Sequence, residues 1–270
     1  DLEAAAQAAG ITMPVIAPDA PLPTITTAPV FTGDEAAVLY TSGSTGRPKG
    51  CVLGNDYFLG AGRWYGAEGG LCALHDGDRM ITPLPIFHMN AMAYSFMAMI
   101  AVGGCLTALD RFHPRTWWQS VRDSGATCLH YLGVMPSMLM GLPASPDDRA
   151  HKVRFGFGAG IDPKLHAGFE DRFGIPLVEA WAMTETGAGA VIAASQPPRR
   201  VGESCLGKPG PGMELRITGD DGSDVAPDQP GELLVRAAGP DPRAGFFRNY
   251  HRDEAATAEA WEGGWFQTGD

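Results

Sequence analysis

Short apolar runs alternate with longer amphipathic segments along the chain from Asp34 onward. The apolar runs predict strands at residues 36–40, 79–83, 105–109, 128–132 and 175–178. The segments between them predict helices near residues 55–68, 91–102, 114–124 and 136–142, with Asn55 as an N-cap and Pro114 in a first turn. This alternation predicts an α/β fold, in which helices cover both faces of a mainly parallel sheet.

The pattern changes after residue 200, where strands are separated by acidic turns. Residues 213–218 alternate apolar and polar side chains, residues 219–222 predict a turn, and residues 232–236 predict the returning strand. We therefore expect three parts: a linker with the end of a preceding subdomain over residues 1–33, the α/β subdomain over 34–200, and a truncated, barrel-like β subdomain over 201–270. The chain starts without a methionine, so we expect it to be a piece of a longer protein.

The composition is typical of a soluble globular protein, and the net charge argues against nucleic acid as a partner. Of the 270 residues 44% are hydrophobic and 19% are charged, and the formal net charge is −11. The longest run of basic residues is the pair Arg199 and Arg200, which is no footprint for a polyanion. A phosphate-rich ligand would therefore need cations at its own site, and bound Mg²⁺ supplies them.

Several other classes of protein are excluded by missing motifs. The five cysteines are odd in number and never form a CxxC pair, which excludes a disulfide framework and a zinc site and predicts a cytoplasmic location. Neither the HExxH motif of metalloproteases nor the GxSxG motif of α/β-hydrolases occurs. The uncharged segment 91–109 is interrupted by Gly103 and Gly104, so we expect a short buried helix and a strand there and no membrane span.

The strongest chemical signal is the segment 41–50, Thr-Ser-Gly-Ser-Thr-Gly-Arg-Pro-Lys-Gly, between two short apolar runs. Glycines let backbone N–H groups face an anion, hydroxyls add donors, and Lys49 can offset phosphate charge. The only Gly-Lys pair is Gly207-Lys208, followed by Pro209, so the segment is not a Walker A loop. A surface turn is the alternative, but the flanking strands and the terminal Pro-Lys-Gly favour a phosphate-binding loop between two strands.

The same segment resembles the signature loop of the AMP-forming adenylating enzymes, which include acyl-CoA synthetases, luciferases and adenylation domains of peptide synthetases. Two further motifs of that family follow in its order, Trp-Ala-Met-Thr-Glu at 181–185 and Gly-Trp-Phe-Gln-Thr-Gly-Asp at 264–270. Residues 85–92 and 155–160 are most similar to the branch of carnitine/crotonobetaine-CoA ligase-like acyl-CoA synthetases. The resemblance runs from about Asp34 to Asp270 and lacks the family's C-terminal domain.

The resemblance implies a role for each matched residue. The β- and γ-phosphates of ATP would be bound by the loop residues Thr41, Ser42, Gly43, Ser44, Thr45, Gly46 and Lys49. Glu185 and Thr41 would bind Mg²⁺, and Thr184 would contact the α-phosphate. The adenosine part would lie against Gly158, Ala159, Gly160, Trp181, Ala182 and Asp270, with Asp270 on the ribose hydroxyls. Trp181 and Ala182 stand where the family commonly has Tyr-Gly.

The implied reaction is ATP-dependent activation of a carboxylic acid to an acyl-adenylate with release of pyrophosphate, followed by transfer to CoA. The implied catalytic residues are Lys49, His88, Thr184 and Glu185, with His88 as the gate between nucleotide and acyl channel. No Asp or Glu occurs from Met80 to Leu109, where relatives that load amino acids keep one, so a plain carboxylic acid is expected. A quaternary-ammonium acid could instead contact the aromatic rings of Trp64, Tyr94 or Tyr131.

Two alternatives stay open at this point. The chain could be a nucleotide or acyl-adenylate binding module without catalysis, since the family's closing domain carries a lysine and the only lysine after Glu185 is Lys208. The enzyme could also load a carrier protein in place of CoA. We expect this piece alone to turn over slowly, because the part that closes the site and excludes water is missing.

Overall fold

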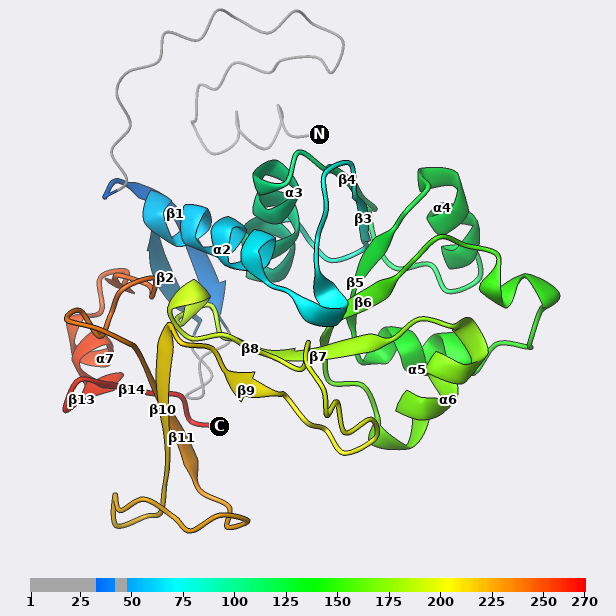
Figure 1. Ribbon diagram of the computed structural model, residues 1–270. Coiled ribbons are helices and arrows are strands. Elements are labelled where there is room, and N and C mark those ends of the chain that lie inside the picture. The colour runs from blue at the N-terminus through cyan, green and yellow to red at the C-terminus, as the bar shows by residue number, and fades with distance from the viewer. Residues whose placement is uncertain (1–32, 42–47) are drawn as a thin grey trace, which may run out of the picture. The chain divides into compact units, whose positions relative to one another are not determined.

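The computed structural model describes residues 33–41 and 48–270 of the chain (Figure 1). The predicted phosphate-loop residues Ser42, Gly43, Ser44, Thr45 and Gly46 lie outside this described part. The described residues belong to one compact unit.

The centre of this unit is a seven-stranded sheet with the order β4-β3-β5-β6-β7-β8-β9. Its first five strands are parallel, and β8 and β9 add to β7 in antiparallel fashion. The strands are β3 (Arg79–Thr82), β4 (Cys105–Ala108), β5 (Cys128–Leu132), β6 (Phe155–Ala159), β7 (Leu177–Trp181), β8 (Ile192–Ala193) and β9 (Lys208–Pro209). The predicted mainly parallel sheet is confirmed.

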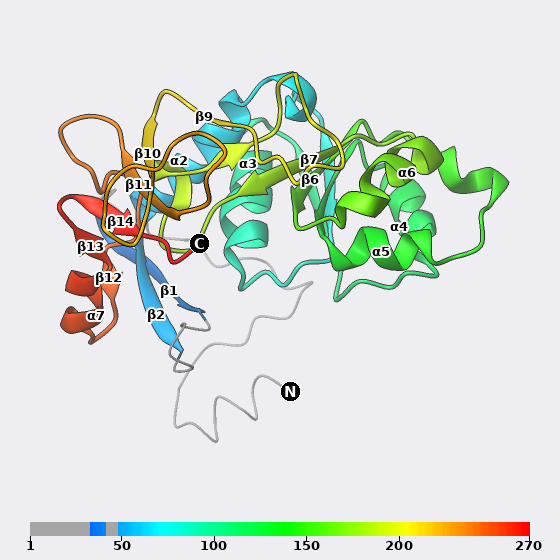
Figure 2. The ribbon, with the colours of Figure 1, turned by 90° about the horizontal axis from the view of Figure 1, so that it is seen from below.

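Helices lie to either side of these strands, as Figures 1 and 2 show. One hydrophobic core contains the apolar side chains of α2 (Asn55–Ala67) and α3 (Met97–Ala101), including Tyr57 and Met99. A second core contains those of α4 (Trp117–Ser124), α5 (Val134–Met140) and α6 (Pro163–Phe173). Short 3₁₀ turns occur at η1 (Gly70–Cys72), η3 (Pro146–Arg149) and η4 (Gly187–Gly189). Two cores on opposite faces are the expected consequence of a sheet whose strands are apolar on both sides.

Two helix starts differ from the sequence prediction. Asn55 is the first helical residue of α2 and the N-cap is Gly54, so the prediction of Asn55 as the cap is wrong. Helix α4 begins at Trp117 after Thr116, so Pro114 precedes the helix and does not lie in its first turn.

The predicted helix near 91–102 has an unusual first half. It opens as the π-helix η2 (Asn90–Phe96) and continues as α3. The hydroxyl of Ser95 donates to the carbonyl of Asn90, five residues earlier, at 3.1 Å. A wide turn of this kind is rare and is frequent at functional sites. In the described part of the chain, no helix is long and apolar enough to cross a membrane.

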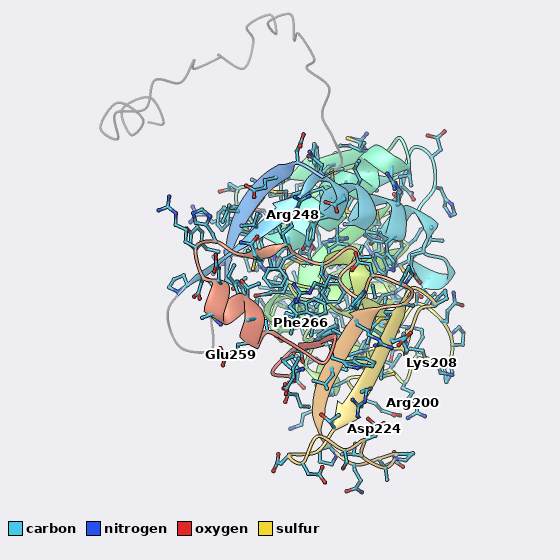
Figure 3. All side chains as sticks on the ribbon, turned by 90° about the vertical axis from the view of Figure 1, so that its left-hand side faces the viewer. Arg200, Lys208, Asp224, Arg248, Glu259 and Phe266 are labelled. Carbon is cyan, nitrogen blue, oxygen red and sulfur yellow. The ribbon has the colours of Figure 1, made fainter. Side chains whose placement is uncertain are left out.

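Two antiparallel sheets complete the unit. The first has the order β1-β2-β12, formed by β1 (Glu35–Thr41), β2 (Lys49–Gly54) and β12 (Asn249–Tyr250). The second has the order β10-β11-β14-β13, formed by β10 (Met213–Thr218), β11 (Glu232–Ala237), β14 (Trp265–Gln267) and β13 (Trp261–Glu262), with α7 (Glu254–Glu259) before β13. Figure 3 shows Phe266 inside this small sheet and Asp224 at its outer end.

Residues of the predicted third part take part in sheets formed mostly by the second part. Strand β9 adds to β8, and β12 pairs with β2 through Asn249 opposite Val52 and Tyr250 opposite Cys51. Because these pairs join residues from both sides of it, the predicted subdomain boundary between residues 200 and 201 stays a prediction. The pairing of β12 matters for function, because it brings Tyr250 to the end of the β1–β2 hairpin.

Candidate functional site

A cavity of about 620 Å³ collects residues from motifs that are far apart in the sequence. The β1–β2 hairpin contributes Thr41 and Lys49, and the segment after β3 contributes His88. The segment after β7 contributes residues 182–185, and residues 266–270 form another wall. His88 and residues 182–185 meet because the parallel strands β3 and β7 end at the same edge of the sheet, where ligands commonly bind. The β1–β2 hairpin and residues 266–270 come to this edge from the two antiparallel sheets.

The contact between Thr41 and Glu185 joins the first two motifs. Thr41 Oγ1 lies 3.4 Å from Glu185 Oε1, although the two residues are 144 positions apart. The hydroxyl of Tyr250 donates to the same carboxylate oxygen at 3.0 Å. Glu185 is only 5% exposed, yet it forms no ion pair with any described residue. A buried carboxylate that has only neutral donors is poorly compensated, and it is suited to bind a cation.

The neighbours of Glu185 are protonated groups. Burial and the Glu185 carboxylate raise the pKa of the Tyr250 hydroxyl, and the same two causes raise the pKa of the Cys51 thiol. Both side chains therefore stay neutral near pH 7 and can act only as neutral partners of the carboxylate. The backbone on either side is held in place, because Tyr57 donates its hydroxyl to Thr184 O at 2.9 Å and Phe247 N donates to Glu185 O at 2.8 Å.

The charges around the cavity are mostly negative in the described residues. Glu185, Glu259 and Asp270 line it, and Lys49 is the lysine among its lining residues. Lys49 Nζ lies 4.9 Å from the centroid of the Tyr250 ring, so the ammonium group faces the same tyrosine whose hydroxyl donates to Glu185. A polyphosphate in this cavity would need a further cation.

The residues predicted to contact adenosine are only partly brought together. Ala182 and Asp270 line the cavity, and Trp181 Nε1 donates to Asp270 Oδ2 at 2.7 Å. Gly158, Ala159 and Gly160 do not line the cavity; they end β6 and start the turn beside β7.

This turn after β6 is held by a buried carboxylate, that of Glu179. It accepts the N–H groups of Gly160 at 3.1 Å and Ile161 at 3.3 Å, and it also accepts the hydroxyl of Tyr131. A Cβ at Gly158 would lie 2.1 Å from Tyr131 O, so the strand needs a glycine at that point. The turn is therefore rigidly supported next to the site.

His88 lines the cavity as predicted, and loss of solvent around its ring lowers its pKa. Of the three aromatic residues considered for a quaternary-ammonium acid, Trp64 and Tyr94 contact each other edge to face, with ring centroids 5.6 Å apart. Tyr131 instead bonds to Glu179. None of the three lines the cavity, so these rings do not form a binding site there.

Sequence reasoning missed Tyr250, which contacts both Glu185 and Lys49. No motif contains this residue, and its place depends on the pairing of two-residue strand β12 with β2. A signal of this kind is too short to be read from the pattern of apolar residues.

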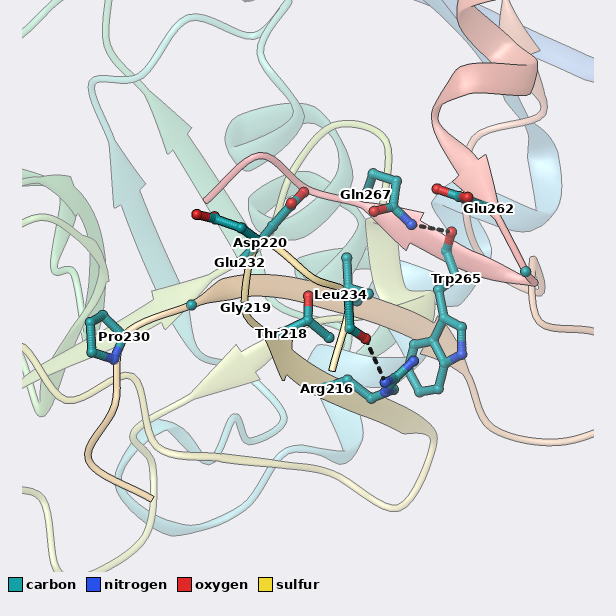
Figure 4. A pocket seen from close by; sticks show the side chains of 13 residues that line it. Arg216, Thr218, Gly219, Asp220, Pro230, Glu232, Leu234, Glu262, Trp265 and Gln267 are labelled. Carbon is teal, nitrogen blue, oxygen red and sulfur yellow. Dashed lines mark hydrogen bonds between the residues drawn. The ribbon is translucent and has the colours of Figure 1, made fainter. Parts of the chain in front are cut away.

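A larger hollow of about 830 Å³ lies on the small sheet and is shown in Figure 4. Arg216 lies over the ring of Trp265 there and forms an ion pair with Asp224, at 2.6 Å between Nε and Oδ1. None of the residues predicted to bind substrate or nucleotide lines it. We therefore assign the candidate site to the smaller cavity.

The fold and the cavity define an α/β protein with a ligand site at the carboxyl edge of its parallel strands. Residues 4–250 match the family model described as AMP-binding enzyme, and the chain belongs to this family. The resemblance to this family is thereby confirmed, and the matched residues include segments 41–50 and 181–185.

Curated relatives include the crotonobetaine/carnitine–CoA ligase of Citrobacter koseri, which is 31% identical over 244 residues. That alignment covers 90% of this chain and 46% of the relative. The protein of the same name from Salmonella typhi is 32% identical over 241 residues, covering 88% and 45%. The chain thus spans about half the length of the curated relatives it matches.

Solved structures show the same fold. ATP-bound MatB from Rhodopseudomonas palustris is 24% identical with a TM-score of 0.77, covering 92% of this chain and 47% of that one. O-succinylbenzoate Coenzyme A synthetase (MenE) from Bacillus subtilis, in complex with AMP, is 23% identical with a TM-score of 0.73, covering 89% and 47%. The N-terminal domain of FACL13 from Mycobacterium tuberculosis is 22% identical with a TM-score of 0.74, covering 92% and 59%.

Proposed function

We propose that the protein to which this chain belongs activates a carboxylic acid with ATP and transfers the acyl group to CoA. The observation that carries the proposal is the meeting of Thr41 and Glu185, 3.4 Å apart, on a cavity that is also lined by Lys49, Thr184 and Asp270. Membership of the AMP-binding enzyme family supports it, and so do the curated relatives, which are named CoA ligases.

The phosphates would lie at the end of the β1–β2 hairpin. Thr41 and Lys49 are opposite each other in the ladder, so both ends of the predicted phosphate loop reach the cavity. The ammonium group of Lys49 would offset phosphate charge, and the hydroxyl of Thr184 would contact the α-phosphate. Ser42, Gly43, Ser44, Thr45 and Gly46 stay predicted phosphate ligands. Asp270, oriented by its bond from Trp181, would accept hydrogen bonds from the ribose hydroxyls.

The donor set fits Mg²⁺ bound mainly by substrate. Glu185 offers a buried carboxylate that has no cationic partner in the described part of the chain, and Thr41 offers a hydroxyl beside it. Among the described residues no group of three or more His, Cys, Asp or Glu could hold a metal alone. Mg²⁺ commonly binds through one or two protein oxygens together with phosphate oxygens. When bound, it would supply neutralisation of the phosphate charge that Lys49 alone does not provide.

The reaction has two steps. In the first, a carboxylate oxygen attacks the α-phosphorus of ATP, the new P–O bond forms, and the bond to pyrophosphate breaks. In the second, the CoA thiol attacks the acyl carbon, the C–S bond forms, AMP leaves with the oxygen, and the thiol proton passes to solvent. The contribution of this chain is positioning and charge stabilisation, which dominate catalysis of transfers at phosphorus.

The substrate, acceptor and location are finer proposals. We keep a plain carboxylic acid, because the segment 80–109 brings no carboxylate to face an ammonium group. CoA is preferred over a carrier protein because the relatives are named CoA ligases. A cytoplasmic location is supported by the five free cysteines, none of which forms a disulfide.

The test is acid-dependent exchange of pyrophosphate into ATP, measured with the complete gene product over aliphatic, aromatic and betaine acids. Lys49→Ala should lower the exchange rate by roughly 100-fold, because a preorganised charge at the transferring phosphate is lost. The exposed Lys152 supplies the matched control, and Lys152→Ala should leave the rate unchanged. An equal rate for Lys49→Ala and the unaltered protein would refute this placement of ATP, and no exchange with any acid would refute the reaction.

A further inference from the structure

His88 lies two residues before the first residue of the π-helix η2, whose N-cap is Met89, and it contacts the backbone of the first turn. Its carbonyl accepts the N–H of Met92 at 3.0 Å, and its ring nitrogen Nδ1 accepts the N–H of Asn90 at 3.2 Å. Ser and Asp side chains commonly accept a backbone N–H two residues further on, and here an imidazole nitrogen replaces their oxygen. Since a backbone N–H can only donate, Nδ1 must be the unprotonated nitrogen of the ring.

Two effects keep this ring neutral. The exposed N–H groups at the start of a helix carry partial positive charge, which disfavours a second positive charge beside them. Loss of solvent at the cavity wall lowers the pKa of His88 in the same direction. A neutral ring with an unprotonated Nδ1 carries its single proton on Nε2.

We propose that Asn90 and the buried His130 are positioning residues, which fix His88 as the neutral Nε2–H tautomer that would face the substrate carboxylate. The inference rests on the proposed function for the identity of the acceptor. It concerns the protonation and orientation of His88, which can be observed without any reaction.

His130 lies in β5 beneath the π-helix and is completely buried. Its Nδ1 is 2.6 Å from Asn90 Oδ1 and 2.8 Å from Ser95 Oγ, and its Nε2 is 3.1 Å from the hydroxyl of Tyr65. Because the amide oxygen of Asn90 can only accept, Nδ1 of His130 carries the proton and Nε2 accepts from Tyr65.

The protonation states of His130 and Tyr65 support this assignment of donors and acceptors. Burial lowers the pKa of His130 to about 3 and raises the pKa of Tyr65 well above its usual value, so both stay neutral near pH 7. Ser95 in turn donates its hydroxyl to the carbonyl of Asn90 at 3.1 Å. All four side chains of this buried network have hydrogen-bond partners, which makes it rigid.

Asn90 links the buried network to the cavity. Its side chain accepts from His130, while its backbone N–H donates to His88. The orientation of the His88 ring is therefore set from inside the protein through one residue. Within the π-helix, Ser95 contacts Asn90 through its hydroxyl, so the first turn of this helix is bonded to the same buried network.

A neutral donor suits the proposed first step. An imidazolium would form a charge-assisted bond with the carboxylate and stabilise it before it attacks phosphorus. A neutral Nε2–H orients the carboxylate with a weaker bond, so less of the nucleophile's reactivity is lost in the ground state.

The direct test is long-range ¹H–¹⁵N NMR of the complete gene product with ¹⁵N-labelled histidine, without ligands, between pH 6 and 8. The spectrum of His88→Gln assigns the signals of His88. We expect the Nε2–H tautomer of a neutral ring throughout the upper part of this range. A Nδ1–H tautomer, or an imidazolium at pH 7, would overturn the inference.

Variants of the network test the positioning role. Asn90→Leu removes the acceptor for His130, whereas Asn90→Asp keeps one. We expect Asn90→Leu to mix the His88 tautomers and to lower the kcat of acid-dependent exchange about tenfold with the KM for ATP unchanged, because orientation and not nucleotide binding is lost. Asn90→Asp should keep most of the His88 Nε2–H tautomer and most of the kcat that Asn90→Leu loses.

His166 supplies the matched control, since it is also a buried histidine and lies on α6, away from the cavity lining. His130→Gln should change the His88 signals, and His166→Gln should not. If Asn90→Leu and His130→Gln both leave the tautomer and kcat unaltered, the positioning role is wrong. If the protein catalyses exchange and His88 is protonated at pH 7, this inference is wrong and the proposed function stands. If His88 has the expected tautomer and no acid supports exchange, the proposed function is wrong and the assignment of the tautomer stands.

Discussion

Two nearly buried glutamates of this protein, Glu170 on helix α6 and Glu185 at the cavity, are treated in opposite ways. Glu170 accepts the backbone N–H of Leu177 at 2.8 Å, a ring nitrogen of His166 at 3.1 Å, and both terminal nitrogens of Arg199. Among the described residues, Glu185 is contacted by neutral groups: the hydroxyls of Tyr250 and Thr41 and the thiol of Cys51. The carboxylate on α6 is fully compensated, and the one at the cavity is not.

The difference separates a structural role from a binding role. A buried ion pair that is also saturated with hydrogen bonds has no capacity for a further ligand, and breaking it leaves an unpaired charge. A buried carboxylate with neutral donors keeps unused lone pairs and an uncompensated charge, which a cation can satisfy. The two sites therefore predict different consequences for the same substitution.

The largest expected effect is on catalysis by Glu185→Gln. We expect the rate of acid-dependent pyrophosphate exchange to fall by about 100- to 1,000-fold, as when one preorganised electrostatic group is removed. Urea denaturation should show little loss of stability, because the amide removes a buried charge for which residues 33–41 and 48–270 provide no cationic partner. Normal exchange in this variant would show that Glu185 is not part of the site.

The reverse outcome is expected for Glu170→Gln. The variant leaves Arg199, whose side chain is only 18% exposed, without its carboxylate, so the free energy of unfolding should fall by about 3 kcal/mol. The remaining folded protein should bind ATP normally. Glu203→Gln is the control, since Glu203 and Arg200 form an exposed pair at 3.8 Å and should change stability by less than about 0.5 kcal/mol.

The pH dependence of stability should follow Glu170. Its bonds with His166, Arg199 and Leu177 overcome the cost of burial and lower its pKa from 4.5 to about 2. The stabilisation is therefore complete above about pH 4.5 and is lost as the pH falls toward 2. We expect the free energy of unfolding, measured by urea denaturation between pH 2 and 6, to depend less steeply on pH in Glu170→Gln than in the unaltered protein. An equal slope in both proteins would contradict the assignment.

The smallest expected effect is that of Tyr250→Phe. This variant removes one neutral donor from Glu185 and leaves the ring that faces Lys49 in place. We expect the affinity for Mg²⁺-ATP to change by a few fold, the size of one neutral hydrogen bond, with an unfolding free energy lowered by about 1 kcal/mol. Isothermal titration and urea denaturation measure the two quantities, and Tyr40→Phe, at an exposed tyrosine, is the control.

The sequence predicted the parts of the molecule that depend on local pattern. Alternating apolar runs predicted the parallel sheet, because buried strands read as continuous apolar segments. The motif residues Thr41, His88, Thr184 and Glu185 were all found in the cavity lining. The uncharged segment 91–109 was correctly divided into a helix and the strand β4.

What the sequence could not predict depends on contacts between distant residues. Tyr250 reaches Glu185 through a two-residue strand, and a pair of residues carries no periodicity. His130 in an apolar strand looks like any core residue, since nothing in the sequence connects it to Tyr65 and Asn90. Gly158, Ala159 and Gly160 stand in the predicted turn, but the lining of the cavity stops short of them.

The short strand β12 has a mechanical consequence. It is attached to the β1–β2 hairpin along one edge and leads directly into α7 and the small sheet, whose residues 266–270 form the opposite wall of the cavity. A shift of that sheet would displace Tyr250. The hydrogen bond from the Tyr250 hydroxyl to Glu185 would then be lost. The capacity of the site to hold charge is in this way tied to the docking of two residues, Asn249 and Tyr250.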